Sequence, residues 1–512
     1  MKLCFPTEYT NFADREHFTP RLAALQKSYE ETLRNKDTDI HTLLNRMEDM
    51  QELMRYYAHT GDYGALEPVM RTQAEYLEQC RSCGVLPGES RAGLSWLEMD
   101  FARINAQLFM ADQDVVQARP YYQEAFTLAG QCFSNILNNN RLSEEQLLYI
   151  GWACAETMQE AASADSAETL DRYHALIPIL EYLEPLMKDY ILIRDQTAEL
   201  YLAAAGVLFS YGEQTQGSRL FQHASLMFRE LYHTHGADIH LVRALWTECL
   251  YSLQVLSSTG QTELLLRCEA AAENVSQTIT AALEHNILQA IRGLTASQKS
   301  IPLQASGQTE QAAALSHQGC RLLVQALRGL EQEREADSYL RGTILSGMLI
   351  RIYHGYAAAL DLLGVQCISL SRPEEAADAF LKILALLRDE QQKLAGTDLS
   401  VMRAEALQYL ALIALMKDNG QECQFYGEQA VQNALEAAER TGLPAAWAIA
   451  IMSCSILSEY YLQYKDKARA AHYANTGLTA CDRLRQIDSC HEQLALSHRL
   501  MQLKKKAARR IF

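Results

Sequence analysis

The chain has 512 residues, of which 48% are hydrophobic and only 10 are proline. It therefore has enough apolar surface for a large core, and its composition is not that of a disordered protein. Its net charge of −17 disfavours a nucleic-acid partner, because an acidic chain repels phosphate backbones. The N-terminus lacks an apolar core of signal-peptide length, and no run of about 18 apolar residues stands out. We therefore predict a cytoplasmic protein without a membrane partner, in which the 13 scattered cysteines are reduced thiols.

The first predicted elements, over residues 16–48, are one or two amphipathic helices without the basic recognition helix of a DNA-binding domain. After them, turn signals separate long helical stretches along the whole chain. Turns inside helical hairpins are expected near residues 61, 113, 164, 212, 260, 307, 371, 420 and 465. Polar connections between hairpins are expected near residues 86–88, 138–140, 188–189, 235–238, 284–286, 334–337, 396–398, 441–444 and 486–488.

The clearest pair of helices lies between residues 201 and 224. Ala205 and Gly217 are small enough for two helices to approach closely, Gly212 marks the turn between them, and Phe221 would fill the space beside them. This order of large, small, turn-glycine, small and aromatic positions resembles a tetratricopeptide repeat, and the resemblance recurs along most of the chain. It implies stacked helical hairpins, here repeating about every 48 residues, compared with about 34 in the family.

We predict an all-α fold, an α-α superhelix (solenoid) of about nine antiparallel helical hairpins. The hairpins would form a single continuous array over residues 1–512. Only the spacing between 307 and 373 is irregular, and we expect a longer helix over 338–363 followed by a longer loop over 364–372. Such an insertion either lies on a binding face or is simple loop growth. Ser143 and Gln146 have the spacing of a capping box that opens a helix.

No phosphate-binding, dinucleotide, zinc-protease or nucleophile-elbow motif occurs in the sequence. Cys80 and Cys83 have CxxC spacing but lack a second ligand pair. The histidines at 233, 235 and 240 are close enough in sequence for a transition-metal site, and a polar helix junction explains them equally. We therefore predict no catalytic residue, no cofactor and no metal site, and a protein that is not an enzyme.

Some tetratricopeptide-repeat proteins hold a terminal carboxylate with a Lys and an Asn one turn apart on the first helix of a hairpin. The corresponding positions here carry no such pair, and the polar residues left as peptide-groove candidates are Arg55, Arg103, Gln107 and Gln254. They would be exposed, either in the groove or on a solvated helix face. The predicted function is a non-enzymatic protein–protein or protein–peptide interaction module or scaffold.

Three alternatives remain open at this point: a peptide-sensing regulatory protein that acts on a separate partner, a metal-dependent enzyme, and a self-assembling scaffold. The identity of the protein or peptide partner and the oligomeric state do not follow from the sequence.

Overall fold

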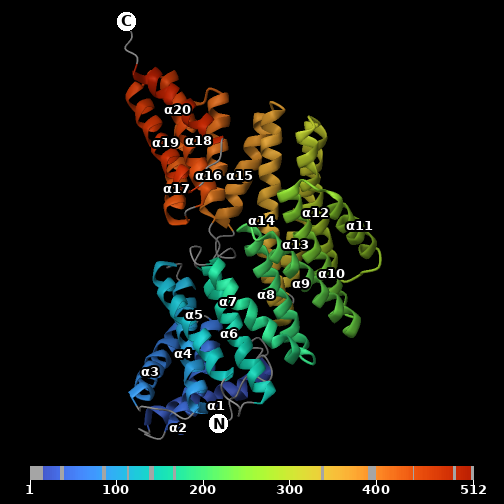
Figure 1. Cartoon of the computed structure of the whole chain (residues 1–512), viewed down its shortest axis with the longest axis vertical. Helices are drawn as coiled ribbons and strands as arrows, with labels where there is room; N and C mark the ends of the chain where they lie inside the picture. Colours follow the sequence, from blue (N-terminus) through green and yellow to red (C-terminus); the bar gives the residue numbers. More distant parts are fainter. Residues whose placement is uncertain are drawn as a thin grey trace. The chain divides into compact units, whose positions relative to one another are not determined.

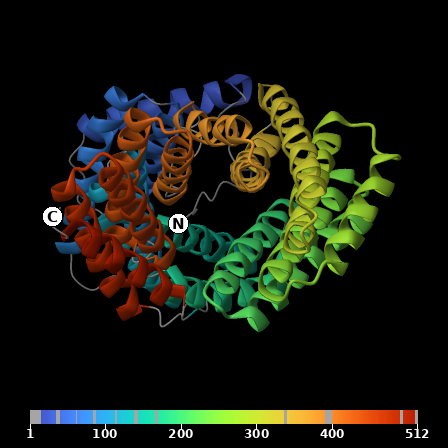
Figure 2. The same cartoon turned by 90° about the horizontal axis from the view of Figure 1, so that it is seen from above.

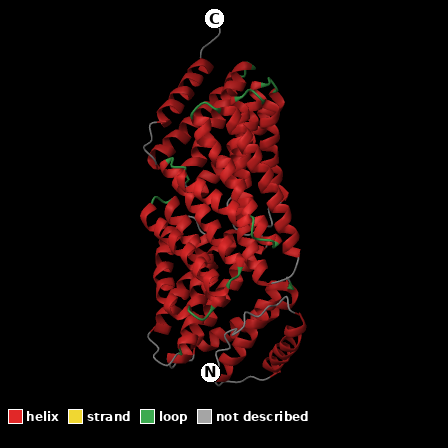
Figure 3. Ribbon diagram, turned by 90° about the vertical axis from the view of Figure 1, so that its right-hand side faces the viewer, coloured by secondary structure: helices red, strands yellow, loops and turns green. Residues whose placement is uncertain are grey.

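All the secondary structure that the described residues form is helical (Figure 3). A computed structural model of the chain describes residues 15–34, 40–60, 62–82, 88–111, 115–137, 143–164, 169–335, 339–389, 399–441, 443–487 and 492–508. The helices are α1 (Arg15–Arg34), α2 (Ile40–Thr60), α3 (Tyr63–Ser82), α4 (Gly88–Ala111), α5 (Val115–Leu137), α6 (Glu144–Ala164), α7 (Thr169–Leu183), the 3₁₀ helix η1 (Glu184–Met187), α8 (Ile191–Ser210), α9 (Gln214–His235), α10 (Asp238–Thr259), α11 (Glu263–Ser276), α12 (Ala282–Ala305), α13 (Thr309–Glu335), α14 (Tyr339–Ser369), α15 (Pro373–Asp389), α16 (Ser400–Met416), α17 (Gly420–Thr441), α18 (Pro444–Gln463), α19 (Lys467–Ile487) and α20 (Glu492–Ala508).

The contacts between helices divide the chain into two compact units. Unit 1 contains Met1–Gln254 and Arg334–Thr343, and unit 2 contains Val255–Glu333 and Ile344–Phe512. That residues 1–512 form a single continuous array stays a prediction.

Within each unit, helices that follow one another pack as hairpins, and each hairpin packs on the next. In unit 1, α4 packs on α5 and α8 on α9, and in unit 2, α16 packs on α17 and α18 on α19 (Figures 1 and 2). The first helices of successive hairpins also touch, as α2 does with α4 and α16 with α18. This is the packing of a helical-repeat solenoid, so the predicted all-α class is confirmed.

The hairpin formed by α8 and α9 confirms the predicted close approach of two helices. Tyr201 and Ala205 are fully buried on α8. A Cβ atom placed on Gly217 of α9 would lie 3.1 Å from the carbonyl oxygen of Ala205, so a larger side chain would push the helices apart. Gly212, between the two helices, has a φ of 87°, a conformation that favours glycine. The helix pairing read from the sequence is therefore present.

The predicted capping box at the start of α6 is also confirmed. The backbone N–H of Ser143 donates to the side-chain oxygen of Gln146 at 3.1 Å. In return, the backbone N–H of Gln146 donates to the Ser143 hydroxyl at 3.2 Å. Two amide groups that the helix itself leaves unpaired are satisfied in this way.

One predicted connection is wrong. Residues 284–286 were expected to join two hairpins, but they lie in the first turn of α12, which begins at Ala282. Leu283 and Ile287, one turn apart, are both buried and fix this segment as helix. The polar side chain of Asn286 fills the space above Gly329, where an added Cβ would lie 2.3 Å from the Asn286 amide nitrogen. A polar residue was therefore mistaken for a turn residue when it packs between helices.

The long interval between 307 and 373 contains the predicted longer helix, since α14 has 31 residues. The longer loop over 364–372 is wrong, because residues 364–369 continue α14. Gly364 lies against the ring of Phe380 on α15, where an added Cβ would be 2.5 Å from the ring carbon Cζ. This glycine allows two helices to approach and does not form a turn. The turn itself is short and includes Ser371, which has a φ of 59°.

Among the described helices, α18 alone is long and apolar enough by composition to cross a membrane, a run that the sequence analysis did not single out. Of its most apolar window, 72% is buried within the structure. Trp447, Ala450 and Cys454 all lie in the core of unit 2. Because core helices of soluble proteins have the same composition, α18 is weak evidence for a membrane span.

Candidate functional site

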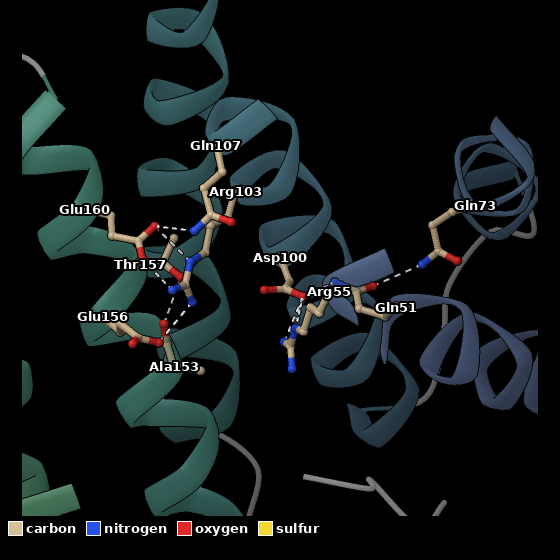
Figure 4. Close-up of polar contacts among 10 residues, drawn as sticks. All are labelled: Gln51, Arg55, Gln73, Asp100, Arg103, Gln107, Ala153, Glu156, Thr157 and Glu160. Atoms are coloured by element: carbon tan, nitrogen blue, oxygen red, sulfur yellow. Dashed lines mark hydrogen bonds and ion pairs between the residues drawn. The ribbon is translucent and has the colours of Figure 1, made fainter. Parts of the chain in front are cut away.

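Polar side chains form a row across the first helices of three successive hairpins in unit 1 (Figure 4). Their spacing of three or four residues on each helix places them on one face, next to the facing helix of the following hairpin. We define the polar row as Gln51 and Arg55 on α2, Asp100, Arg103 and Gln107 on α4, and Glu156 and Glu160 on α6.

The first half of the polar row is centred on the buried carboxylate of Asp100, which is only 2% exposed. Arg55 donates to its Oδ2 atom from Nε at 2.8 Å and approaches it with Nη2 at 2.7 Å. The Gln51 amide donates to the same oxygen at 2.5 Å and accepts from Gln73 of α3 at 3.1 Å. The guanidinium of Arg55 also lies over the ring of Trp96, 5.1 Å from its centroid. These contacts fix Arg55 in place while 27% of its side chain stays exposed.

The second half of the polar row is centred on Arg103. Its Nη1 atom lies 3.0 Å from Glu156, its Nε donates to Glu160 at 2.9 Å, and Nη2 pairs with the other Glu160 oxygen. Gln107 donates to Glu160 at 3.0 Å. Burial acts to lower the pKa of Arg103, but Glu156 and Glu160 outweigh it, and the pKa lies well above its usual value. The guanidinium is therefore a permanent cation held by two carboxylates of the next hairpin.

The structure places the four predicted site residues as follows. Arg55, Arg103 and Gln107 come together in the polar row, but they are half-buried and paired, and not exposed as expected. Gln254 is half-buried on α10, and no described contact joins it to the row. Arg55, Arg103 and Gln107 are not exposed because each of them contacts a carboxylate from the adjacent first helix. That these residues contact a partner stays a prediction.

Sequence reasoning missed the three acids of the row, Asp100, Glu156 and Glu160. The available signal was local: Asp100 precedes Arg103 by three residues, and Glu156 and Glu160 are one turn apart on the next first helix. Nothing in the sequence states which arginine each acid meets.

A similar set of ion pairs connects α8 and α10 in unit 1. Arg243, 1% exposed, pairs with Asp195 and, at 2.9 Å, with Glu199, while its guanidinium lies 4.4 Å from the Phe228 ring centroid. Burial acts to raise the pKa of Asp195, but Arg243 outweighs it and the pKa lies below its usual value. His240 shares this carboxylate through Nδ1 at 3.2 Å.

The histidines at 233, 235 and 240 do not converge. His240 points into the buried pair with Asp195, whereas His233 and His235 are exposed at the end of α9. Over the described residues, no three His, Cys, Asp or Glu side chains are arranged to hold a metal ion. Cys80 is buried on α3, with its sulfur 3.8 Å from that of Met47, and Cys83 lies outside the described residues. The absence of a metal site stays a prediction.

No protein-family model matches this sequence, and no curated protein matches it. Among solved structures, the chain is similar to a Signal Transduction ATPase with Numerous Domains (STAND) protein with a tetratricopeptide repeat sensor from Pyrococcus horikoshii, at 11% identity and a TM-score of 0.39, covering 86% of this chain and 54% of that one. It is also similar to a Rap protein complexed with Competence and Sporulation Factor, at 15% identity and a TM-score of 0.37, covering 82% and 99%. A third similar structure is yeast Tom70, at 11% identity and a TM-score of 0.32, covering 95% and 97%. The chain thus spans about half the length of the first of these proteins, and at such identities and scores the likenesses assign neither a family nor a function to this chain.

Proposed function

We propose that this chain is a non-enzymatic module that binds a protein or peptide, and that the polar row contacts the partner. The observation that carries the proposal is that Arg55 and Arg103 are held in fixed positions on successive first helices by carboxylates of the neighbouring helix. The partner would be a polypeptide, and not a nucleic acid or a membrane, in keeping with the net charge of −17.

An extended peptide offers backbone N–H and C=O groups that need partners when it leaves water. The polar row offers both kinds of partner, because guanidinium and amide groups donate and carboxylates accept. Side chains that are already ordered lose little entropy when a ligand arrives, which favours binding. The partly exposed edges of Arg55, Glu156 and Glu160 are the atoms that a ligand would reach, with 25–27% of each side chain accessible.

The same proposal includes two further points. The chain would act in the cytoplasm, which is supported by the absence of disulfides among the described cysteines. The repeat unit would be a hairpin of about 48 residues, which is supported by the starts of α6, α8 and α10 at residues 144, 191 and 238, each 47 residues after the one before.

The test is selection from a random peptide display library on the full-length protein, followed by measured dissociation constants. A double variant, Arg55→Ala with Arg103→Ala, should weaken the selected peptides by about tenfold or more, because it removes the accessible guanidinium of Arg55 and releases Glu156 and Glu160 from the cation that fixes them. The matched control is Arg71→Ala on α3, whose side chain is 73% exposed in a surface pair with Glu67. Thermal melting of each variant establishes that it is folded.

Equal affinity of the double variant and the wild type would show that the polar row is not the binding face. Failure to select any peptide, together with failure to capture any protein from native cell extract, would contradict the binding module itself.

A further inference from the structure

Three charged pairs connect the second helices of two successive hairpins in unit 1, α7 with η1 on one side and α9 on the other. His174 Nε2 lies 2.9 Å from Glu213, which directly precedes α9. Arg219 lies 3.5 Å from Glu181. His223 Nε2 lies 2.9 Å from Glu184. We call these six residues the histidine seam: His174, Glu181, Glu184, Glu213, Arg219 and His223.

The order of the pairs shows that the seam is one continuous contact. Residues 174, 181 and 184 advance along α7 and η1, while their partners 213, 219 and 223 advance along α9 in the same direction. The partners are 39, 38 and 39 residues apart in the chain, so the two segments run parallel at a constant offset. Two of the three pairs depend on a histidine.

The surroundings of His223 favour its charged form. His223 pairs with Glu184 of η1. The ring of Tyr201 on α8 packs edge-on against the His223 ring, with 4.9 Å between the ring centroids. The Tyr201 hydroxyl also donates to Glu184 at 3.4 Å. Its own helix adds Arg219 and Glu230, with opposite effects. The hydrogen bond with Glu184 raises the pKa of His223 and outweighs burial, and the same bond lowers the pKa of Glu184.

Both histidine pairs are open to solvent protons. The side chains of His174 and Glu213 are 37% and 35% exposed, and those of His223 and Glu184 are 32% and 36% exposed. A change of pH therefore reaches them without unfolding. The Glu181–Arg219 pair lies between them and contains no histidine.

We propose that the histidine seam is a pH-sensitive joint between the third and fourth hairpins of unit 1, closed when His223 is protonated and weakened when it is neutral. Histidine is the side chain whose charge ordinarily changes between pH 5 and 8. The folded protein binds the proton of His223 more tightly than the unfolded chain does. The stabilisation from the ion pair with Glu184 is therefore fully present below the ordinary histidine pKa of 6.5, and it is lost as the pH rises through the raised pKa of His223. A neutral histidine still donates a hydrogen bond to its glutamate but no longer forms an ion pair.

The consequence of the joint is local. At alkaline pH the ion pair between His223 and Glu184 is lost, so α9 should open more often against α7 and η1. In a repeat protein each hairpin contacts mainly its neighbours, so a weaker contact at one joint changes the angle there and is not averaged over a common core. This inference does not depend on the proposed binding function.

The experiment is hydrogen exchange with mass spectrometry on the full chain at pH 5.5 and pH 8.0, corrected for the intrinsic exchange rate. Three proteins are compared: the wild type, the variant His223→Gln, and the control Arg229→Gln. The control removes an interhelical pair of similar exposure that contains no histidine, Arg229–Glu248 at 2.6 Å between α9 and α10.

At pH 5.5 the variant His223→Gln should exchange faster than the wild type in α7 and α9, by about two- to fivefold. At pH 8.0 this difference should disappear, whereas the effect of Arg229→Gln should be the same at both pH values. An equal effect of His223→Gln at both pH values would overturn the proposal.

If His223→Gln does not fold, the wild type decides the question by itself. Histidine resonances followed by NMR should give a titration midpoint for His223 above 6.5, the ordinary value. A midpoint at or below 6.5 would refute the pH-sensitive joint.

Discussion

Acidic side chains between first helices have different partners in the two units, and those of unit 2 are half-buried. In unit 1, Asp100 meets Arg55 and Asp195 meets Arg243. In unit 2, Asp361 on α14 and Glu405 on α16 lie near each other, and neither has a hydrogen-bond or ion-pair partner among the described residues. Burial and then the nearby Glu405 raise the pKa of Asp361 to about 7, and burial raises the pKa of Glu405.

The comparison shows that one architecture holds its helices together by two kinds of contact. In unit 1 Asp100 and Asp195 join neighbouring hairpins through guanidinium groups, so the contacts are strong and directional. In unit 2 burial raises the pKa of Asp361 to about 7, so the charge at this contact depends on pH. The two units should therefore differ most when an arginine is removed from unit 1 or when the carboxyl charge of Asp361 is removed from unit 2.

The largest effect is expected from Arg243→Met in unit 1. The substitution leaves Asp195, 2% exposed, as a buried charge without its guanidinium partner, and should lower the free energy of unfolding by about 3–5 kcal/mol. Urea denaturation at pH 7 measures the change. The control Arg267→Met removes an exposed pair with Glu263 on α11 and should change stability by less than about 0.5 kcal/mol. A loss below 1 kcal/mol for Arg243→Met would mean that the guanidinium is not what holds the acids of unit 1.

A smaller effect is expected from Gly217→Leu, which tests the helix packing of unit 1 without changing a charge. An added Cβ would lie 3.1 Å from the Ala205 carbonyl oxygen and 3.1 Å from the Phe209 backbone nitrogen, so the helices must separate at a cost of about 1–3 kcal/mol.

Thermal melting measures the effect of Gly217→Leu, and the control Gly206→Ala on α8 has open space around the added carbon. That control should raise stability by up to about 1 kcal/mol, because alanine favours helix over glycine. An unchanged melting midpoint for Gly217→Leu would show that the pairing of α8 and α9 is wrong.

The smallest effect is expected from Asp361→Asn in unit 2, and it should depend on pH. The pKa of Asp361 in the folded protein, about 7, lies above its ordinary value of 3.8. The contribution of the protonated carboxyl to the free energy of unfolding is therefore fully present below pH 3.8 and is lost as the pH rises towards 7. The asparagine variant does not suffer this loss and should be more stable than the wild type at pH 8 by about 1–2 kcal/mol.

The advantage of Asp361→Asn should shrink towards zero at pH 4, as measured by urea denaturation at both pH values. Asp100→Asn in unit 1 is the matched control, and it should destabilise at pH 8, because Asp100 accepts from Arg55 and Gln51. A wild type that is more stable than Asp361→Asn at pH 8 would remove the difference between the units.

The sequence by itself determined the helices and, among the described residues, the turns near residues 212, 260, 307, 371 and 465; the turns predicted near 61 and 113 lie outside the described residues. Apolar residues at helical spacing, Gly212 in its positive-φ turn and Pro373 at the first position of α15 are local signals, because they depend on neighbours within one or two turns. Local signals misled where a residue serves packing between helices, as Asn286 does against Gly329 and Gly364 against Phe380.

Only the tertiary structure decided what the polar residues do. Arg55 pairs with Asp100, which is 45 residues further along the chain, and Arg103 pairs with Glu160, which is 57 residues further along. Neither partner therefore follows from helical periodicity. The same holds for His223 and Glu184, 39 residues apart. The pattern of small and large residues fixes which helices pair, but the rotation of each first helix against the next fixes which charges meet. That rotation is set by side-chain packing along the whole hairpin, and no short stretch of sequence contains it.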